Sequence, residues 1–129
     1  MITGERILEI SGKRESTEGI KGLGINISVE DVKVSGETVE LTYEYLANYD
    51  EKVGFLKIRG QINAKEDKKL AKDIEAEWKA NKKLPDNYAE MLLAAINYSG
   101  SANGTLLARV LNLTAPLIPP RIQLSKKEQ

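Results

Sequence analysis

The sequence predicts an α+β fold, in which a four-stranded antiparallel sheet (a meander) is covered by one long helix and a shorter, charged helix. Two observations predict it. Between residues 25 and 64, apolar and polar residues alternate in segments separated by short polar turns, which is typical of antiparallel strands with one wet face. Between residues 66 and 111, the apolar residues recur at helical spacing instead.

Four segments are predicted as strands. Residues 6–11 form a short first strand, and residues 25–34 form the second, with a change of phase at Glu30 and Asp31 that indicates a bulge. Residues 39–49 and 53–64 form the third and fourth strands. At 129 residues the chain is expected to be one domain, 1–129, with residues 1–5 and 125–129 frayed.

Two helices follow the strands. Residues 66–83 place Leu70, Ile74 and Trp78 on one stripe of a charged helix. Residues 86–111 form the long helix, about 39 Å in length, which exceeds what a small domain needs to cover its sheet and favours self-association. Its small residues Gly100, Gly104 and Ala108 lie four apart, so they either admit another helix in a homo-oligomer or mark a kink or break.

The segment 113–124 contains three prolines, which exclude a helix and a central strand. We therefore expect it to be extended, along a sheet edge or across the surface.

Composition excludes several functions. Nineteen basic and nineteen acidic residues give a net charge of zero, so no overall field attracts nucleic acid or an anionic membrane. The absence of cysteine and histidine excludes thiol and Ser-His-Asp catalysis and a structural zinc site. No apolar run is long enough for a membrane span and no signal peptide begins the chain, so a cytoplasmic protein without cofactor or metal is expected. Abundant lysine and glutamate without cysteine suit a thermophile.

Three local motifs carry a family resemblance: Gly54-Phe55-Leu56 at the start of the last strand, Tyr88-Ala89 at the start of the long helix, and residues 111–116 (LNLTAP) at its end. With the order of strands and helix, the chain resembles, from about residue 7 to 124, the SecB-like family of the protein-export chaperone SecB and its archaeal and toxin–antitoxin relatives. The resemblance implies a four-stranded sheet packed with a helix, assembly into dimers and dimers of dimers, and binding of unfolded polypeptide in apolar grooves without ATP. The chain departs from the family in its zero net charge, in lacking the further C-terminal helix, and in its longer, more charged first helix.

Two functions are therefore predicted. The first is ATP-independent, chaperone-like binding of unfolded or extended polypeptide, with a groove formed by Tyr43, Tyr45, Tyr49, Phe55, Trp78, Leu113, Leu117 and Ile118. Packing in the core explains each of the three tyrosines as well as a groove does. For Trp78, docking of its own helix onto the domain is a better explanation than a groove. The second is a structural or adaptor protein that uses the fold to assemble with itself or with one dedicated partner, through Gly100, Gly104 and Ala108.

Catalysis and nucleic-acid binding are disfavoured. The carboxylate pairs Glu30-Asp31 and Asp73-Glu77 could bind a hard cation or share a proton, but lysines surround the second pair, as on a solvated face of ion pairs. The basic pairs at residues 82–83 and 126–127 have no interleaved aromatic residues on which bases could stack.

Overall fold

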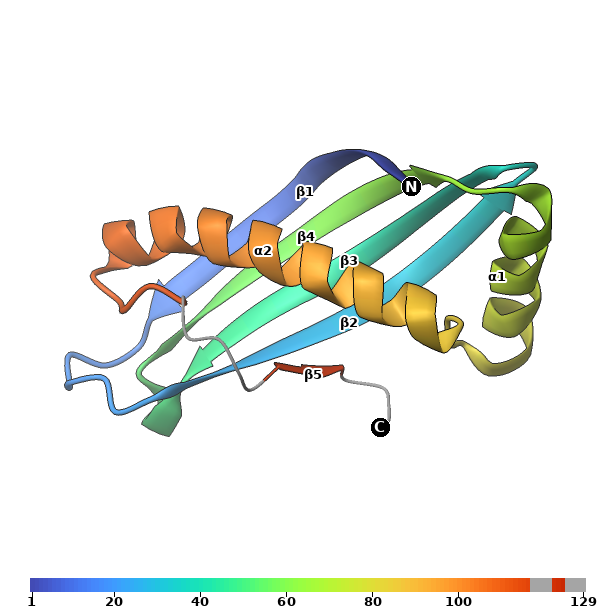
Figure 1. Cartoon of the computed structure of the whole chain (residues 1–129). Coiled ribbons are helices and arrows are strands. Elements are labelled where there is room, and N and C mark those ends of the chain that lie inside the picture. The colour runs from blue at the N-terminus through green and yellow to red at the C-terminus, as the bar shows by residue number, and fades with distance from the viewer. Residues whose placement is uncertain (117–121, 125–129) are drawn as a thin grey trace.

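The computed structural model describes residues 1–116 and 122–124 and shows an α+β fold, as predicted (Figure 1). A 3-10 turn, Asp50–Lys52, joins the third and fourth strands. In chain order the elements are β1 (Ile2–Arg14), β2 (Leu23–Ser35), β3 (Thr38–Tyr49), β4 (Gly54–Lys65), α1 (Lys68–Asn81), α2 (Asp86–Leu111) and β5 (Ile122–Leu124).

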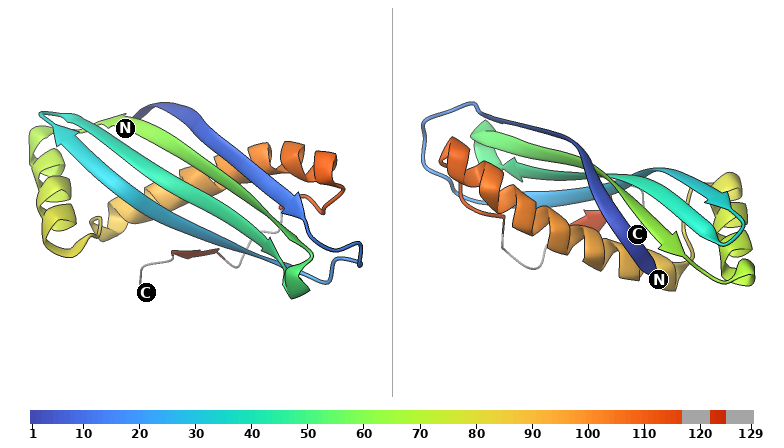
Figure 2. Two further views of the ribbon diagram at one scale, coloured as in Figure 1. Left: turned by 180° about the vertical axis from the view of Figure 1, so that it is seen from behind. Right: turned by 90° about the horizontal axis from the view of Figure 1, so that it is seen from above.

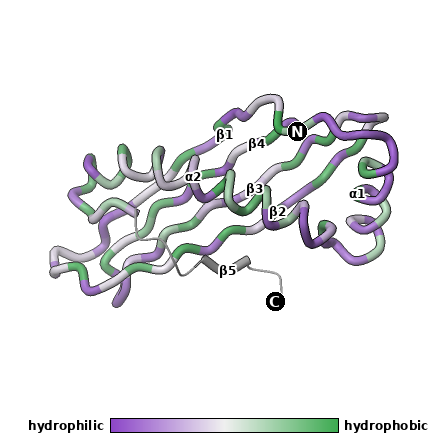
Figure 3. The backbone as a smooth tube through the Cα atoms, in the orientation of Figure 1, coloured by the Kyte–Doolittle hydropathy of each residue, from purple (hydrophilic) through white to green (hydrophobic). Residues whose placement is uncertain are grey.

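The strands form one sheet in the order β1-β4-β3-β2-β5. The four long strands are antiparallel, as predicted, and β2, β3 and β4 form a meander. A register shift between Val29 and Asp31 confirms the predicted bulge. The alternation of hydrophobic and hydrophilic residues along these strands is visible in Figure 3, and it places the apolar side of each strand on the same face of the sheet.

The position and length of β1 differ from the prediction. It pairs with β4 rather than with its sequence neighbour β2, and it begins at Ile2, so residues 2–5, expected to be frayed, are part of the strand. Residues 125–129, for which the same was expected, lie outside the described residues. The connector of residues 15–22 crosses the end of the sheet to reach β2. Its ends bond to the turn between β3 and β4, since Glu15 donates to the Val53 carbonyl at 2.7 Å and Gly22 accepts from Asp50 at 2.9 Å.

The helices lie on one face and at one end of the sheet. The α2 helix crosses one face diagonally, and α1 stands at the end where β2 turns into β3 (Figures 1 and 2). The opposite face carries no helix in the described part of the chain. At the start of α1, Asp67 accepts a hydrogen bond from the Leu70 amide at 2.8 Å, which caps the helix.

The core lies between α2 and the apolar face of the sheet. Its largest buried side chains include Tyr43, Tyr45, Leu41, Ile58 and Ile62. From α2, Leu92 and Ile96 face this layer, and from α1, Ile74 and Trp78 do so. One apolar layer is therefore shared by the sheet and both helices.

The bounds of α2 match the prediction to the residue, and the helix is continuous, so the break considered at its glycines is wrong. It begins after Pro85 and ends at Leu111, and the capping residue Asn112 adopts the left-handed conformation with φ of 58°. Residues 113–116 then turn back beneath the helix, where Leu113 and Pro116 are buried. As predicted for the tail, Ile122–Leu124 lies at a sheet edge, where it runs parallel to β2.

Candidate binding surface

The buried and exposed residues of α2 form two rows on opposite sides of the helix. Each row contains every fourth residue, so it winds slowly around the axis, as expected for a helix that crosses a sheet obliquely. The buried row is Tyr88, Leu92, Ile96, Gly100, Gly104 and Ala108. The exposed row is Glu90, Ala94, Tyr98, Ala102, Leu106 and Val110.

After Glu90 the exposed row carries no charge and is mostly apolar. Tyr98 is 80% exposed, Leu106 64% and Val110 82%. We call the five residues Ala94, Tyr98, Ala102, Leu106 and Val110 the outer row. A surface helix normally presents charged residues to water, so the outer row is unusual for a face left in solvent.

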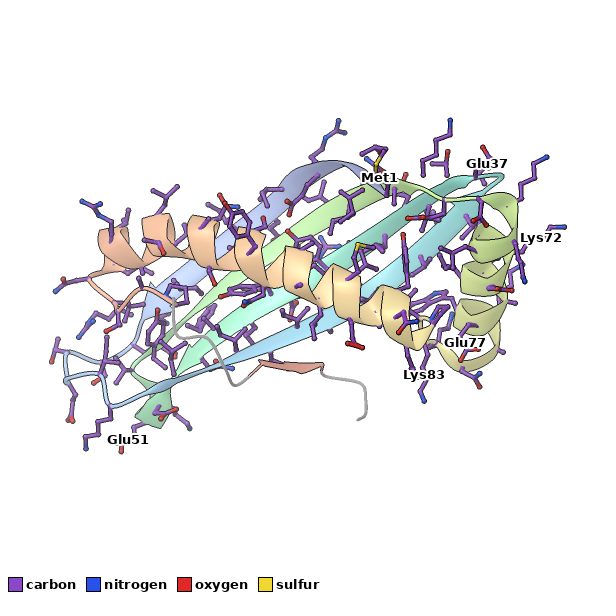
Figure 4. All side chains as sticks on the ribbon, viewed as in Figure 1. Met1, Glu37, Glu51, Lys72, Glu77 and Lys83 are labelled. Carbon is purple, nitrogen blue, oxygen red and sulfur yellow. The ribbon has the colours of Figure 1, made fainter. Side chains whose placement is uncertain are left out.

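The α1 helix provides the contrast within the same chain. Its exposed positions include Lys68, Lys69, Lys72, Asp73 and Lys79, as expected for a helix face in water. In Figure 4, Lys72 points away from the sheet. The uncharged face of α2 is therefore a property of that helix rather than of the composition of the chain.

The β1 strand adds three exposed apolar side chains. Ile7, Leu8 and Ile10 are 37%, 46% and 52% exposed. Ile7 and Ile10 pair with Gly60 and Ile58, so they lie on the helix-covered face of the sheet, where α2 leaves them partly exposed.

The α2 helix and β1 are in contact at the C-terminal end of α2. There the Leu111 side chain lies so close to Gly12 that a Cβ atom at Gly12 would be 3.0 Å from it. Ile10 precedes Gly12 on the same face of β1, and Val110 adjoins Leu111. Exposed apolar residues from the strand and from the helix thus flank this contact.

The predicted groove of tyrosines is wrong, because the rings are core residues. Tyr43 and Tyr45 are 0% exposed and Tyr49 is 2% exposed. Each projects from β3 toward α2, where the sheet and the helix exclude solvent. The alternation of β3 placed these residues on one face correctly, and that face is the inside of the protein.

The other predicted groove residues are not brought together. Trp78 and Leu113 are buried, and Trp78 docks α1, with the Lys82 ammonium 5.5 Å from its ring centre. Phe55 pairs with Asn48 and lies on the opposite face of the sheet from the tyrosines, half-buried. Leu117 and Ile118 lie outside the described residues.

The small residues predicted as an oligomer interface are buried inside the chain, which corrects that prediction. Gly100 faces the Tyr45 ring, and a Cβ atom at Gly104 would be 2.8 Å from Pro116 Cγ. Ala108 is 0% exposed. The close approach that their spacing predicted is real, but it is made with the sheet and with the returning tail.

The polar groups beneath α2 maintain the fold. The Tyr43 hydroxyl donates to the Glu5 carboxylate and the Tyr49 hydroxyl to the Thr114 carbonyl. Burial, and then the bond to Glu5, raises the pKa of Tyr43, and burial also raises the pKa of Tyr45. Burial, and then the neighbouring Tyr45, raises the pKa of Tyr49 to about 12. These hydroxyls therefore stay protonated at neutral pH.

Three of the four carboxylates considered for catalysis have structural partners. Glu30 accepts from Arg59 at 2.9 Å, and Asp31 accepts from the Val32 amide at 3.0 Å. Glu77 accepts from Asn81 at 3.2 Å. Among residues 1–116 and 122–124, no three acidic, histidine or cysteine side chains are grouped so that they could hold a metal ion.

Comparisons with known proteins give no match for this chain. No protein-family model, no curated protein and no solved structure matches it. Within the part that the structure describes, no helix is both long and apolar enough to cross a membrane.

The sequence did contain a signal for the outer row. From Met91 to Ala108 the chain has no acidic or basic residue, although 29% of all its residues are charged. Helical spacing alone identified the buried row. The complementary observation, that the opposite row is also uncharged, points to the exposed surface.

Proposed function

We propose that this protein binds unfolded or extended polypeptide without ATP, and that the outer row and the exposed residues of β1 form the binding surface. The outer row is the observation that carries the proposal. A helix that is apolar on its buried face and uncharged on its outer face is expected to be covered in its working state. Exposed apolar segments of an unfolded chain would cover it.

The shape of the surface suits a variable ligand. Large side chains, Tyr98 and Leu106, alternate with the small side chains Ala94 and Ala102 along the row. The row therefore offers exposed apolar side chains of different sizes, without a charge to select one sequence. Binding would be driven by burial of apolar area. The resemblance to SecB-like proteins implies the same activity, and that resemblance and a cytoplasmic location stay predictions.

A structural or adaptor role is the second candidate, and the same observation supports it. Alternating large and small residues on an i+4 row allow two helices to interdigitate. Two copies of α2, or α2 and one dedicated partner, would then bury the outer row permanently. In that case no surface would remain for unfolded chains.

Calorimetric titration with a reduced and carboxymethylated protein that cannot refold tests the proposal. We expect binding with a negative heat-capacity change, and none to the same protein in its folded form. The variant Leu106→Asp/Val110→Asp should bind at least tenfold more weakly, because a fully buried leucine or valine contributes about 1.5–3 kcal/mol. Ala76→Asp/Ala80→Asp, at exposed positions of α1, adds the same charge and should bind as the wild type does.

Sedimentation analysis of the same variants separates the two candidates. A wild-type oligomer that Leu106→Asp/Val110→Asp converts to monomer, with no heat from the unfolded chain, would establish the adaptor role. Equal binding by both double variants would show that the outer row is not the binding surface.

A further inference from the structure

The outer edge of β2 is only partly covered. β3 pairs with β2 along its whole length, from Leu23 to Ser35, whereas β5 pairs with Ile25, Asn26 and Ile27 alone. The bulge between Val29 and Asp31 ends the regular part of the strand. The straight part of this edge, residues 23–29, therefore has more positions than the described part of the tail occupies.

The segment that occupies the edge has an alternating pattern. Ile122, Gln123 and Leu124 lie in parallel register with Ile25, Asn26 and Ile27. Ile25 and Ile27 are buried on the helix-covered face, and Asn26 lies on the other face. Because paired positions share a face of a sheet, the edge accepts apolar residues at alternate positions and a polar residue between them.

Asn26 adds a chemical preference at the middle position. Its side-chain oxygen is buried and accepts no hydrogen bond from any described residue. A buried acceptor without a donor costs free energy. A strand that places a donor opposite Asn26 would remove that cost.

The tail is anchored at residues 112–116, which we call its root. It is weakly held at Ile122–Leu124, which we call its tip. At the root, Leu113 and Pro116 are buried, Tyr49 donates to the Thr114 carbonyl, and Arg14 donates to the Asn112 carbonyl at 2.8 Å. Among the described residues, the tip pairs at three positions, and so short a ladder does little more than offset the entropy lost in ordering it. The tip can therefore leave β2 while the root stays in the core.

We propose that the β2 edge binds an extended peptide segment in parallel register, with apolar residues at alternate positions and a hydrogen-bond donor between them. The chain's own Ile122–Leu124 is a built-in occupant that such a segment displaces. Main-chain hydrogen bonds to the sheet edge supply affinity, and the alternating side chains supply specificity. This edge lies across the sheet from β1, so it is separate from the exposed apolar residues of β1.

Fluorescence anisotropy with a labelled peptide, Gly-Arg-Ile-Gln-Leu-Ser-Lys-Gly, tests the proposal on the full-length protein. The variant Ile122→Pro/Leu124→Pro cannot pair its tip, because proline lacks the amide donor. It should bind the peptide about tenfold more tightly than the wild type does if the tip is docked in about nine-tenths of molecules. Ile122→Val/Leu124→Ile keeps the pattern and should bind as the wild type does.

Three further measurements identify the site and the occupant. A peptide with aspartate in place of its isoleucine and leucine should not bind. Peptide binding should slow hydrogen exchange at the amides of residues 25–29 in the proline variant. Leu106→Asp/Val110→Asp should bind the peptide with wild-type affinity, so a failure here differs from a failure of the outer-row proposal.

Several results would overturn the proposal. The first is peptide binding by the proline variant that is equal to or weaker than that of the wild type, when circular dichroism shows that the variant is folded. Loss of binding in Leu106→Asp/Val110→Asp would place the peptide on the outer row instead. A wild-type dimer that the proline variant turns into a monomer without peptide binding would show that the edge takes the tail of a second copy.

Discussion

Two tyrosine rings of β3 occupy space that glycines leave open. Tyr43 lies over Gly60 of β4, where a Cβ atom would be 2.5 Å from the ring, and Tyr45 lies against Gly100 of α2. The absence of a side chain at each glycine lets a large ring lie flat in a thin core. At residue scale, the fit of sheet to helix depends on these two pairs.

Gly100→Ala should destabilise the protein despite the better helix propensity of alanine. The new methyl group would collide with the Tyr45 ring, and such overpacking costs about 1–3 kcal/mol. The gain in propensity is at most about 1 kcal/mol. Urea denaturation should therefore show a free energy of unfolding lower by about 1–2 kcal/mol. Gly24→Ala, where no atom lies within 4 Å of the new methyl group, should not be destabilising, and an equal loss there would contradict the explanation.

Spacing of small residues predicted a close approach but not the partner. The row Gly100, Gly104 and Ala108 admits any backbone or ring, whether from another helix, another copy or the sheet of the same chain. The partner is set by long-range packing of Tyr45 and Pro116, which no local pattern contains. For the same reason, the alternation along β3 predicted that the tyrosines share one face of the sheet, but it could not show that α2 covers that face.

At the scale of elements, α1 depends on a single cap. Asp67 accepts from the Leu70 amide, and no acidic residue in the first turn helps to compensate the helix dipole. Asp67→Ala should therefore lower the free energy of unfolding by about 1 kcal/mol. Thermal or urea denaturation measures this. Asp73→Ala, at an exposed position in the same helix, should cost less, and equal costs would mean that charge rather than capping matters.

Element boundaries were predictable where local chemistry determines them. Pro85 and the left-handed Asn112 set the ends of α2, and the phase change at Glu30 located the bulge. The extent of β1 was not predictable, because most of its side chains are exposed and show little alternation. Its pairing with β4 is made by backbone groups, which every residue except proline carries in the same form.

At the scale of the whole molecule, the sheet has two edges with different exposure. β1 leaves apolar side chains uncovered beside the outer row, and β2 is partly covered by the chain's own tip. The uncovered face of the sheet is mostly polar, with Arg59 bonded to both Glu9 and Glu30 across the strands. The surfaces proposed for binding therefore lie on the helix side and at the β2 edge, not on this polar face.

The core as a whole should make the protein sensitive to alkali. Tyr43, Tyr45, Tyr49 and Tyr88 are buried in one layer, and burial is the first cause that raises the pKa of each. Between about pH 10, where tyrosines of the unfolded chain ionise, and about pH 12, the pKa of Tyr49, the folded state keeps protons that the unfolded state loses. The free energy of unfolding must then fall as pH rises through this window, by about 1.4 kcal/mol per pH unit for each such tyrosine.

Urea denaturation at pH 9, 10, 11 and 12 measures this fall, and Tyr49→Phe isolates one contribution to it. The variant loses the bond to the Thr114 carbonyl, so it should be less stable than the wild type at pH 9, by about 1 kcal/mol. Because it has one titrating group fewer, its stability should decline less steeply above pH 10, and the two curves should cross at about pH 11, so that the variant is the more stable protein at pH 12. Parallel curves over the whole range would contradict the assignment, since Tyr49 would then ionise alike in the folded and unfolded chains.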